Sequence, residues 1–155
     1  MESPPKIPPS TSPAPDWLRE LGWDEVYEVR RLIARGGMGR VYEGWHRTLS
    51  IPVALKIIDP HLTGEDHIRA RFEKEAMTLA RLQEPVPHPN IVRVLDFKLL
   101  DNVGCIVMAY IQGMDLRAWC VDQELGNNER VGLIEKVARA TGYFHSFGLV
   151  HRDLK

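Results

Sequence analysis

Cysteine is scarce in this chain of 155 residues, which contains only Cys105 and Cys120. Two cysteines so far apart in the sequence do not make a disulfide framework. Neither has a second cysteine or a histidine nearby at the spacing of metal ligands, so no metal site is expected at either one. This usage is typical of a reducing compartment, and we expect a cytoplasmic location.

Long apolar runs and an excess of one charge are also absent. The longest wholly apolar run, residues 105–111, is far too short to span a bilayer, which takes about 20 residues. The first residues lack the basic and then apolar pattern of a secretory signal. The formal net charge of -1 favours neither nucleic acid nor an anionic membrane as a partner. The sequence therefore predicts a soluble protein without a membrane segment.

Proline is concentrated at the start of the chain, where residues 1–15 hold six of them. We expect these residues to form a disordered tail, because such a segment holds neither helix nor sheet. Docking of the tail on a proline-reading domain is the alternative. Residues 16–26 are expected to form a short helical lead-in, capped by Asp16 and ended by Gly22. Its apolar residues should pack on the domain that follows; they are Trp17, Leu18, Leu21 and Trp23.

Hydrophobic residues make up 44% of the chain, enough for a core, and the region from residue 27 begins as β-structure. Strands are expected over residues 27–33, 40–46 and 51–58. Between the first two lies the stretch 34–41 (ARGGMGRV), whose glycines could leave backbone N–H groups open to a phosphate. An ordinary hairpin turn is the alternative. Lys56 stands in an otherwise apolar strand, either as an edge lysine facing water or as a buried amine with a fixed partner.

A helix is predicted over about residues 65–83, capped by Thr63 or Asp66, because apolar residues recur there at helical spacing. Those residues are Ile68, Phe72, Ala76, Leu79 and Leu82. Two strands should follow at 91–99 and 103–111, and then a short helix at 115–124. A longer helix is expected after residues 126–128; it should run to about Phe147 and be ended by Gly148. The last helix carries an apolar stripe of Leu133, Val137, Ala140 and Phe144. A small sheet followed by helices indicates the α+β class.

Three motifs in this order resemble the eukaryotic-type protein kinase family. Residues 34–41 align with G-x-G-x-x-G-x-V, residues 53–56 (VALK) with V-A-I-K, and residues 151–155 (HRDLK) with the start of H-R-D-L-x-x-x-N. The spelling GGMGRVY at 36–42, and Lys155 two residues after Asp153, are most similar to bacterial serine/threonine members. Rival interpretations fail: a Walker A loop needs Lys and Ser/Thr after its second glycine, and a dinucleotide fingerprint would open a helix where residues 41–45 predict a strand.

The resemblance implies a kinase N-lobe and hinge over 27–111, with a five-stranded antiparallel sheet and the αC helix. Residues 112–155 would be a partial helical C-lobe that stops within the catalytic loop. ATP and Mg²⁺ would be the cofactors, and protein serine or threonine hydroxyls the substrates. Asp153 would orient the hydroxyl proton, Lys155 would neutralise phosphate charge, and Lys56 would hold the α- and β-phosphates with Glu75 as its partner. Glu73 is the alternative partner on the same helix.

The resemblance also implies the ATP-binding residues. The adenine slot would be lined by Ile33, Val41 and Ala54, with Met108 as gatekeeper and Ala109, Tyr110 and Ile111 as the hinge. The phosphate loop would be formed by Ala34, Gly36, Gly37, Met38 and Gly39. Ala34 replaces the first glycine of the motif, and it would cost on the order of 1 kcal/mol if that position needs a positive φ.

The family's magnesium ligands would lie beyond Lys155, so this chain is expected to have no metal site of its own. Two hypotheses follow. The chain is the N-terminal part of an active serine/threonine kinase, cut within the catalytic loop and inactive alone. Alternatively, it is a natural non-catalytic fragment that binds ATP or another protein. The helical stripe at Leu133, Val137 and Phe144 would lack its usual cover, which predicts aggregation or association through that face.

Overall fold

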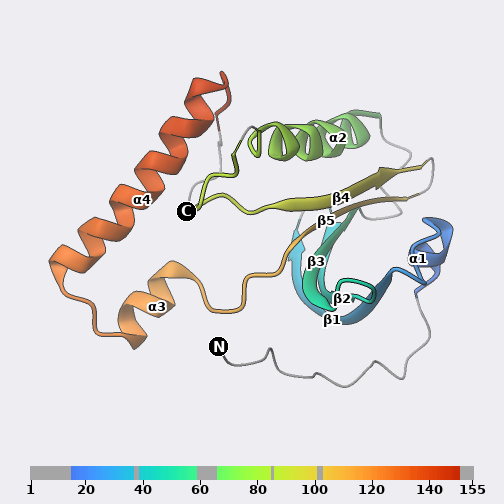
Figure 1. Cartoon of the computed structure of the whole chain (residues 1–155), viewed down its shortest axis with the longest axis horizontal. Coiled ribbons are helices and arrows are strands. Elements are labelled where there is room, and N and C mark those ends of the chain that lie inside the picture. Colours follow the sequence, from blue (N-terminus) through green and yellow to red (C-terminus); the bar gives the residue numbers. More distant parts are fainter. Residues whose placement is uncertain (1–14, 37–38, 59–65, 85, 101–102, 151–155) are drawn as a thin grey trace. The chain divides into compact units, whose positions relative to one another are not determined.

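The computed structural model describes residues 15–36, 39–58, 66–84, 86–100 and 103–150 (Figure 1). The proline-rich tail expected at residues 1–15 lies outside this range except for Pro15. The chain divides into two compact units, Met1–Ala76 with Val94–Tyr110 and Met77–Arg93 with Ile111–Lys155.

The first unit is built on a five-stranded antiparallel sheet with the order β1-β2-β3-β5-β4. Its strands are β1 (Tyr27–Gly36), β2 (Gly39–His46), β3 (Ile51–Ile58), β4 (Val94–Leu99) and β5 (Gly104–Ala109). The predicted antiparallel sheet is therefore confirmed. Strand β4 starts three residues after the predicted residue 91, because the Ile91 N–H closes a turn onto the His88 carbonyl at 3.1 Å.

Helix α1 (Asp16–Glu20) packs on one face of this sheet (Figure 1). Leu18 and Leu21 are fully buried there. They belong to a cluster drawn from the lead-in and from three strands: Leu18, Leu21, Trp23, Tyr27, Val53, Leu55, Ile57, Val103, Cys105 and Val107. The segment before residue 27 is thus part of the core, as its apolar residues predicted.

The ends of α1 differ in part from the prediction. Gly22, with φ of +66°, follows the helix in the left-handed conformation expected of a terminating glycine. Asp16 is not the N-cap, which is Pro15. A proline is suited to this boundary because it lacks an N–H to satisfy, and the Asp16 carboxylate instead accepts a hydrogen bond from Arg19 at 3.1 Å.

Helix α2 (Asp66–Arg81) packs on the opposite face through the residues that belong to the first unit. Ile68, Phe72 and Ala76 are buried against Ile58 and Ile106, which confirms the predicted apolar face of this helix. Strand β3 serves both layers because successive side chains of a strand point to opposite faces. Of the two predicted caps, Asp66 lies in the first turn and Thr63 lies outside the described residues.

The two cysteines carry no disulfide. Cys105 is fully buried in the cluster under α1, and this burial, followed by the nearby charge of Asp96, raises the pKa of its thiol. A thiol is nucleophilic only as its thiolate, so Cys105 is a core residue without chemical reactivity. Cys120 lies on helix α3 and is half-buried.

The second unit contains helices α3 (Leu116–Asp122) and α4 (Asn127–Ser146). The Asp115 carboxylate caps α3 by accepting a hydrogen bond from the Ala118 N–H at 2.8 Å. The side chain of Glu129 accepts one from the Gly126 N–H at 2.8 Å at the start of α4. Gly148, with φ of +69°, ends α4 as predicted.

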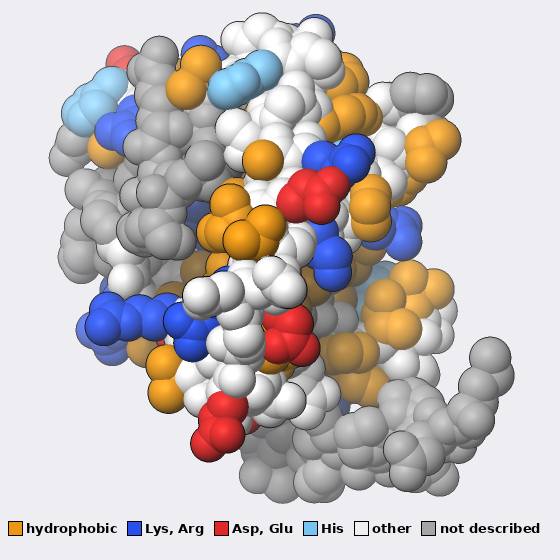
Figure 2. Space-filling view, turned by 90° about the vertical axis from the view of Figure 1, so that its left-hand side faces the viewer, with side chains coloured by type: hydrophobic (Ala, Val, Ile, Leu, Met, Phe, Trp, Pro, Cys, Tyr) orange, Lys and Arg blue, Asp and Glu red, His pale blue; other side chains and the backbone are white. Residues whose placement is uncertain are grey.

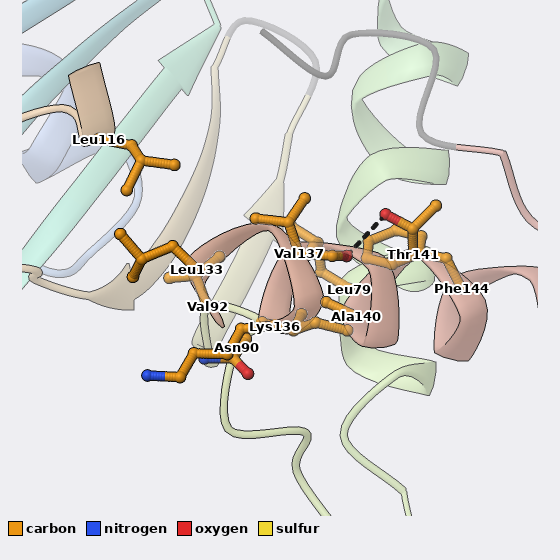
Figure 3. A pocket seen from close by; sticks show the side chains of 11 residues that line it. Leu79, Asn90, Val92, Leu116, Leu133, Lys136, Val137, Ala140, Thr141 and Phe144 are labelled. Atoms are coloured by element: carbon orange, nitrogen blue, oxygen red, sulfur yellow. Dashed lines mark hydrogen bonds between the residues drawn. The ribbon is translucent and has the colours of Figure 1, made fainter. Parts of the chain in front are cut away.

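The apolar stripe of α4 lines a groove of about 360 Å³ within the second unit (Figure 3). Leu133, Val137, Ala140 and Phe144 form one wall, and Leu79, Val92 and Leu116 contribute from other segments of the unit. Figure 2 shows hydrophobic side chains, in orange, among charged ones on the side where α4 lies nearest the viewer. Val131 and Ile134 are more than half exposed on this helix. The association predicted for this face stays a prediction.

Candidate functional site

Two cross-strand pairs lie side by side on the face of the sheet that α2 contacts. Val41 of β2 pairs with Lys56 of β3, and Ala54 of β3 pairs with Met108 of β5. Paired residues share a face, and so do residues two apart on one strand. Lys56 also pairs with Ile106, whose side chain packs against α2. The sheet register therefore brings together four residues predicted to contact ATP.

Lys56 and Glu75 form an ion pair in this first unit, with Nζ and Oε1 separated by 2.5 Å. Strand β3 lies between β2 and β5, so Lys56 is not an edge lysine. The two side chains are only 23% and 31% exposed. Glu73, the alternative partner, is exposed. The expected pairing is present, and it keeps a cation in a largely apolar strand by giving it a partner.

The glycine-rich hairpin closes with Gly36 of β1 paired to Gly39 of β2. Gly37 and Met38 lie outside the described residues. A Cβ at Gly39 would lie 1.9 Å from the Ile57 carbonyl oxygen, whereas the nearest atom to a Cβ at Gly36 is 4.0 Å away. The third glycine of the motif is therefore required by packing against β3. At Gly36 an added Cβ would make only an ordinary contact, so packing does not require glycine there.

Ala34 pairs with Val41 and carries no strain. Among the described residues other than glycine, only Ser50 and Glu124 have positive φ. The energetic cost that was considered for Ala34 does not arise, because alanine adopts ordinary strand dihedrals without penalty.

Strand β1 is irregular in a way that the sequence pattern did not reveal. Its register with β2 shifts between Val29 and Arg31 and again between Leu32 and Ala34. Each shift inserts one extra residue, first Arg30 and then Ile33, and a bulge of this kind redirects the side chains beside it. Ile33, predicted to line the adenine slot, is 38% exposed at the second shift.

The predicted hinge begins where β5 ends at Ala109. Tyr110 is the last residue of the first unit and Ile111, which is 73% exposed, begins the next part of the second. The catalytic residues predicted by resemblance, Asp153 and Lys155, lie outside the described residues. The roles predicted for all these residues toward ATP stay predictions.

One polar cluster at this site was missed by the sequence analysis. An Arg31 guanidinium nitrogen lies 2.6 Å from the Glu43 carboxylate and donates a hydrogen bond to the Tyr110 hydroxyl at 3.2 Å. Neither spacing nor motif signals this contact. It depends on the bulge at Arg30, which pairs Arg31 directly with Glu43.

Within the part of the chain that the structure describes, no group of three or more His, Cys, Asp or Glu side chains is placed to hold a metal ion. No described helix is long and apolar enough to cross a membrane.

Comparison with known proteins agrees with this arrangement. The family model of the protein kinase domain matches residues 27–155. The chain is 36% identical over 132 residues to the probable serine/threonine-protein kinase PknB of Lactococcus lactis, a match that covers 83% of this chain and 20% of that protein. It is 36% identical over 130 residues to the serine/threonine-protein kinase PknE of Mycobacterium bovis, covering 83% of this chain and 22% of PknE. The chain thus spans about a fifth of the length of these relatives.

Among solved structures, the chain is similar to the kinase domain of Mycobacterium tuberculosis PknI. The TM-score is 0.64 at 33% identity, and the match covers 84% of this chain and 53% of that one. The sheet and helices described above therefore correspond to about half of a kinase domain. With a family match that extends from β1 to the last residue, the chain belongs to the protein kinase domain family, and the two relatives named above are bacterial serine/threonine kinases.

Proposed function

We propose that the first unit binds ATP on the face that carries Val41, Ala54, Lys56 and Met108. The observation that carries this proposal is the Lys56–Glu75 pair at 2.5 Å in an interior strand. The Glu75 carboxylate holds the half-buried Lys56 amine in one orientation, which suits it to contact a phosphate group.

The surrounding residues fit such a ligand. Adenine needs an apolar slot with backbone hydrogen-bonding groups at its edge. Val41, Ala54 and Met108 supply apolar side chains, and the backbone after β5 would supply the hydrogen bonds. Gly36 carries no side chain, so its backbone N–H would approach the phosphates. Ile33, from β1, would close the slot on the opposite side of the base.

We further propose that the protein is a serine/threonine kinase that transfers phosphate from ATP to protein hydroxyls in the cytoplasm. Asp153 would orient the substrate hydroxyl and accept its proton, while Lys155 would neutralise charge on the transferred group. The proposal rests on family membership and on the motif at 151–155. Two free cysteines support the location.

The described residues contain no group of three or more His, Cys, Asp or Glu side chains that could hold Mg²⁺ without the nucleotide. ATP supplies the phosphoryl group, and Mg²⁺ normally neutralises charge on its phosphates. By the family motif, the magnesium-binding positions would follow Lys155.

Nucleotide binding is tested by replacing Lys56 with methionine. ATP at 100 times its Kd should stabilise the unmodified chain by about 2.7 kcal/mol, seen as a rise in Tm. Lys56→Met should weaken binding at least about tenfold, the effect of losing roughly 1.4 kcal/mol of interaction. Lys74→Met, which removes the same charge from an exposed position on α2, is the matched control. An ATP-induced shift that survives Lys56→Met unchanged would count against this pocket.

Residues 1–155 alone are expected to transfer no phosphate. The reason is that the magnesium-binding positions of the family lie outside this segment, and charge neutralisation supplies most of the catalysis of phosphoryl transfer. The assay follows labelled phosphate from ATP-Mg²⁺ to a generic basic protein substrate and to the chain itself. Robust transfer that Asp153→Asn abolishes would contradict the expectation.

A further inference from the structure

We propose that Arg31, Glu43 and Tyr110 form a bracket that holds strand β1 over the nucleotide site and so sets the affinity for ATP. Arg31 acts as a positioning residue in this proposal. The inference rests on the proposed function, and its test separates the two.

The contacts of Arg31 join three segments of the first unit. Its guanidinium lies 2.6 Å from the Glu43 carboxylate on β2 and donates to the Tyr110 hydroxyl, after β5, at 3.2 Å. In the sheet, β1 and β5 are separated by β2 and β3. The hydrogen bond to Tyr110 therefore ties together two parts of the sheet that share no backbone ladder.

The Glu43 carboxylate restricts where the Arg31 guanidinium can lie. Its side chain is 11% exposed, and its buried Oε2 accepts no hydrogen bond from any described group. Arg31 lies within ion-pairing distance of that same oxygen and supplies the compensating charge. A buried carboxylate without a cation is strongly disfavoured, so the position of Arg31 is restricted by the need to remain beside Glu43.

Arg31 and Glu43 lie on the same face of the sheet as the proposed nucleotide site. Arg31 pairs with Glu43, Glu43 pairs with Ala54, and Ala54 pairs with Met108 in one row across four strands. Strand β1 is an edge strand, bonded on one side only, and it carries the near half of the glycine hairpin. The hydrogen bond from Arg31, in the middle of β1, to Tyr110 limits how far this strand moves from the proposed adenine slot. Preorganisation of that kind increases affinity by removing an ordering cost from binding.

A second explanation for any effect of Arg31 is that its charge simply attracts the triphosphate. The two explanations predict opposite results for Glu43→Gln. Removing a negative charge would strengthen ATP binding if charge alone acted. It would weaken binding if the carboxylate is needed to hold Arg31 in the bracket.

The experiment measures the Kd of the full chain for a fluorescent ATP analogue. Arg31→Gln, Glu43→Gln and Tyr110→Phe are each expected to raise it roughly three- to tenfold, the range for losing one hydrogen bond or ion contact. Arg71→Gln removes the same charge from an exposed position on α2 and should leave the Kd unchanged. Arg31→Gln already removes the hydrogen bond between Arg31 and Tyr110. The double variant Arg31→Gln/Tyr110→Phe should therefore bind the analogue no more weakly than Arg31→Gln alone.

The outcomes are distinguishable. If the unmodified chain does not bind the analogue, or if Lys56→Met binds equally well, the proposed function fails. If those two behave as proposed but the bracket variants match Arg71→Gln, the bracket is wrong. Tighter binding by Glu43→Gln overturns it as well. Tyr110→Phe keeps all charges and removes one exposed hydroxyl. Its Kd therefore tests the bracket even if Arg31→Gln or Glu43→Gln misfolds. Melting of nucleotide-free Tyr110→Phe should change little, because the hydrogen bond that it removes is exposed. Arg31→Gln should melt at a lower temperature, because it leaves the buried Glu43 carboxylate without its cation.

Discussion

Replacing Leu18 with alanine is expected to lower the free energy of unfolding of the first unit by about 2–5 kcal/mol, the usual cost of truncating a buried leucine. Leu18 is fully buried, and it belongs to the same cluster as Val53, Leu55 and Val107 of the interior strands β3 and β5. The loss would leave a cavity between α1 and the sheet. Because the same β3 strand carries Lys56 on its other face, the variant should also bind nucleotide more weakly.

Urea unfolding followed by tryptophan fluorescence measures this change. Trp17, Trp23 and Trp45 all lie in the first unit, and Trp119 is the single tryptophan of the second. The signal therefore reports mainly on the unit that contains Leu18. Glu20→Ala, an exposed substitution on the same helix, is the control and should change stability little. Equal midpoints for the two variants would show that α1 does not contribute to the core.

The folded unit extends to residues that precede the family match. The family match begins at residue 27, yet the cluster under α1 includes Leu18, Leu21 and Trp23. Lys98 of β4 also donates a hydrogen bond to the Leu21 carbonyl at 2.7 Å, which fixes the end of the lead-in on the sheet. A chain that began at Tyr27 would expose this apolar face to water and lose both contributions.

The second large effect is expected from Gly39→Ala. A methyl group there would lie 1.9 Å from the Ile57 carbonyl oxygen and 3.1 Å from the Ile58 Cα. Both are backbone atoms of β3, so no side-chain rotation relieves the clash and the two strands must separate at this point. Overpacking of this kind costs typically about 1–3 kcal/mol, and rigid backbone neighbours favour the upper end. The hairpin would shift with β2, so ATP affinity should fall as well.

Gly36→Ala is the matched control for stability. Gly36 pairs with Gly39 across the same hairpin, has no positive φ, and has nothing closer than 4.0 Å to an added Cβ. Its alanine variant should unfold at nearly the same urea concentration as the unmodified chain. If both alanine variants unfold at the same urea concentration, the close approach of Gly39 to β3 does not exclude a side chain at position 39.

Much of the fold was predictable from residue patterns. Strands alternate apolar residues toward a packed face, and the helix over 66–81 repeats them at helical spacing, so element types followed from where apolar side chains can be buried. Glycine after α1 and α4 ended both helices as expected. Asp16 was assigned to the wrong position because a first-turn aspartate and an N-cap aspartate look alike in sequence.

The candidate site was predictable only in part. Glu75 was selected over Glu73 by its position in the family motif, and the structure brings it to Lys56. Glu73 and Glu75 are two residues apart on α2 and therefore lie on different sides of its apolar stripe, so the pattern alone did not say which side faces Lys56. The bracket was not predictable, since a bulge depends on how one strand fits its neighbour and leaves no fixed residue pattern.

The sequence by itself determined the order of elements, the α+β class and the glycine, lysine and glutamate positions of the motifs, because local periodicity and short spacings encode these. Tertiary structure decided which residues share a face and which must be small. Gly39 is the clearest example: its motif position suggested a role toward phosphate, whereas the fold shows that β3 leaves no room for a side chain. The contact between Arg31 and Tyr110 likewise arises only when strands distant in sequence are folded together, because it spans 79 residues of chain.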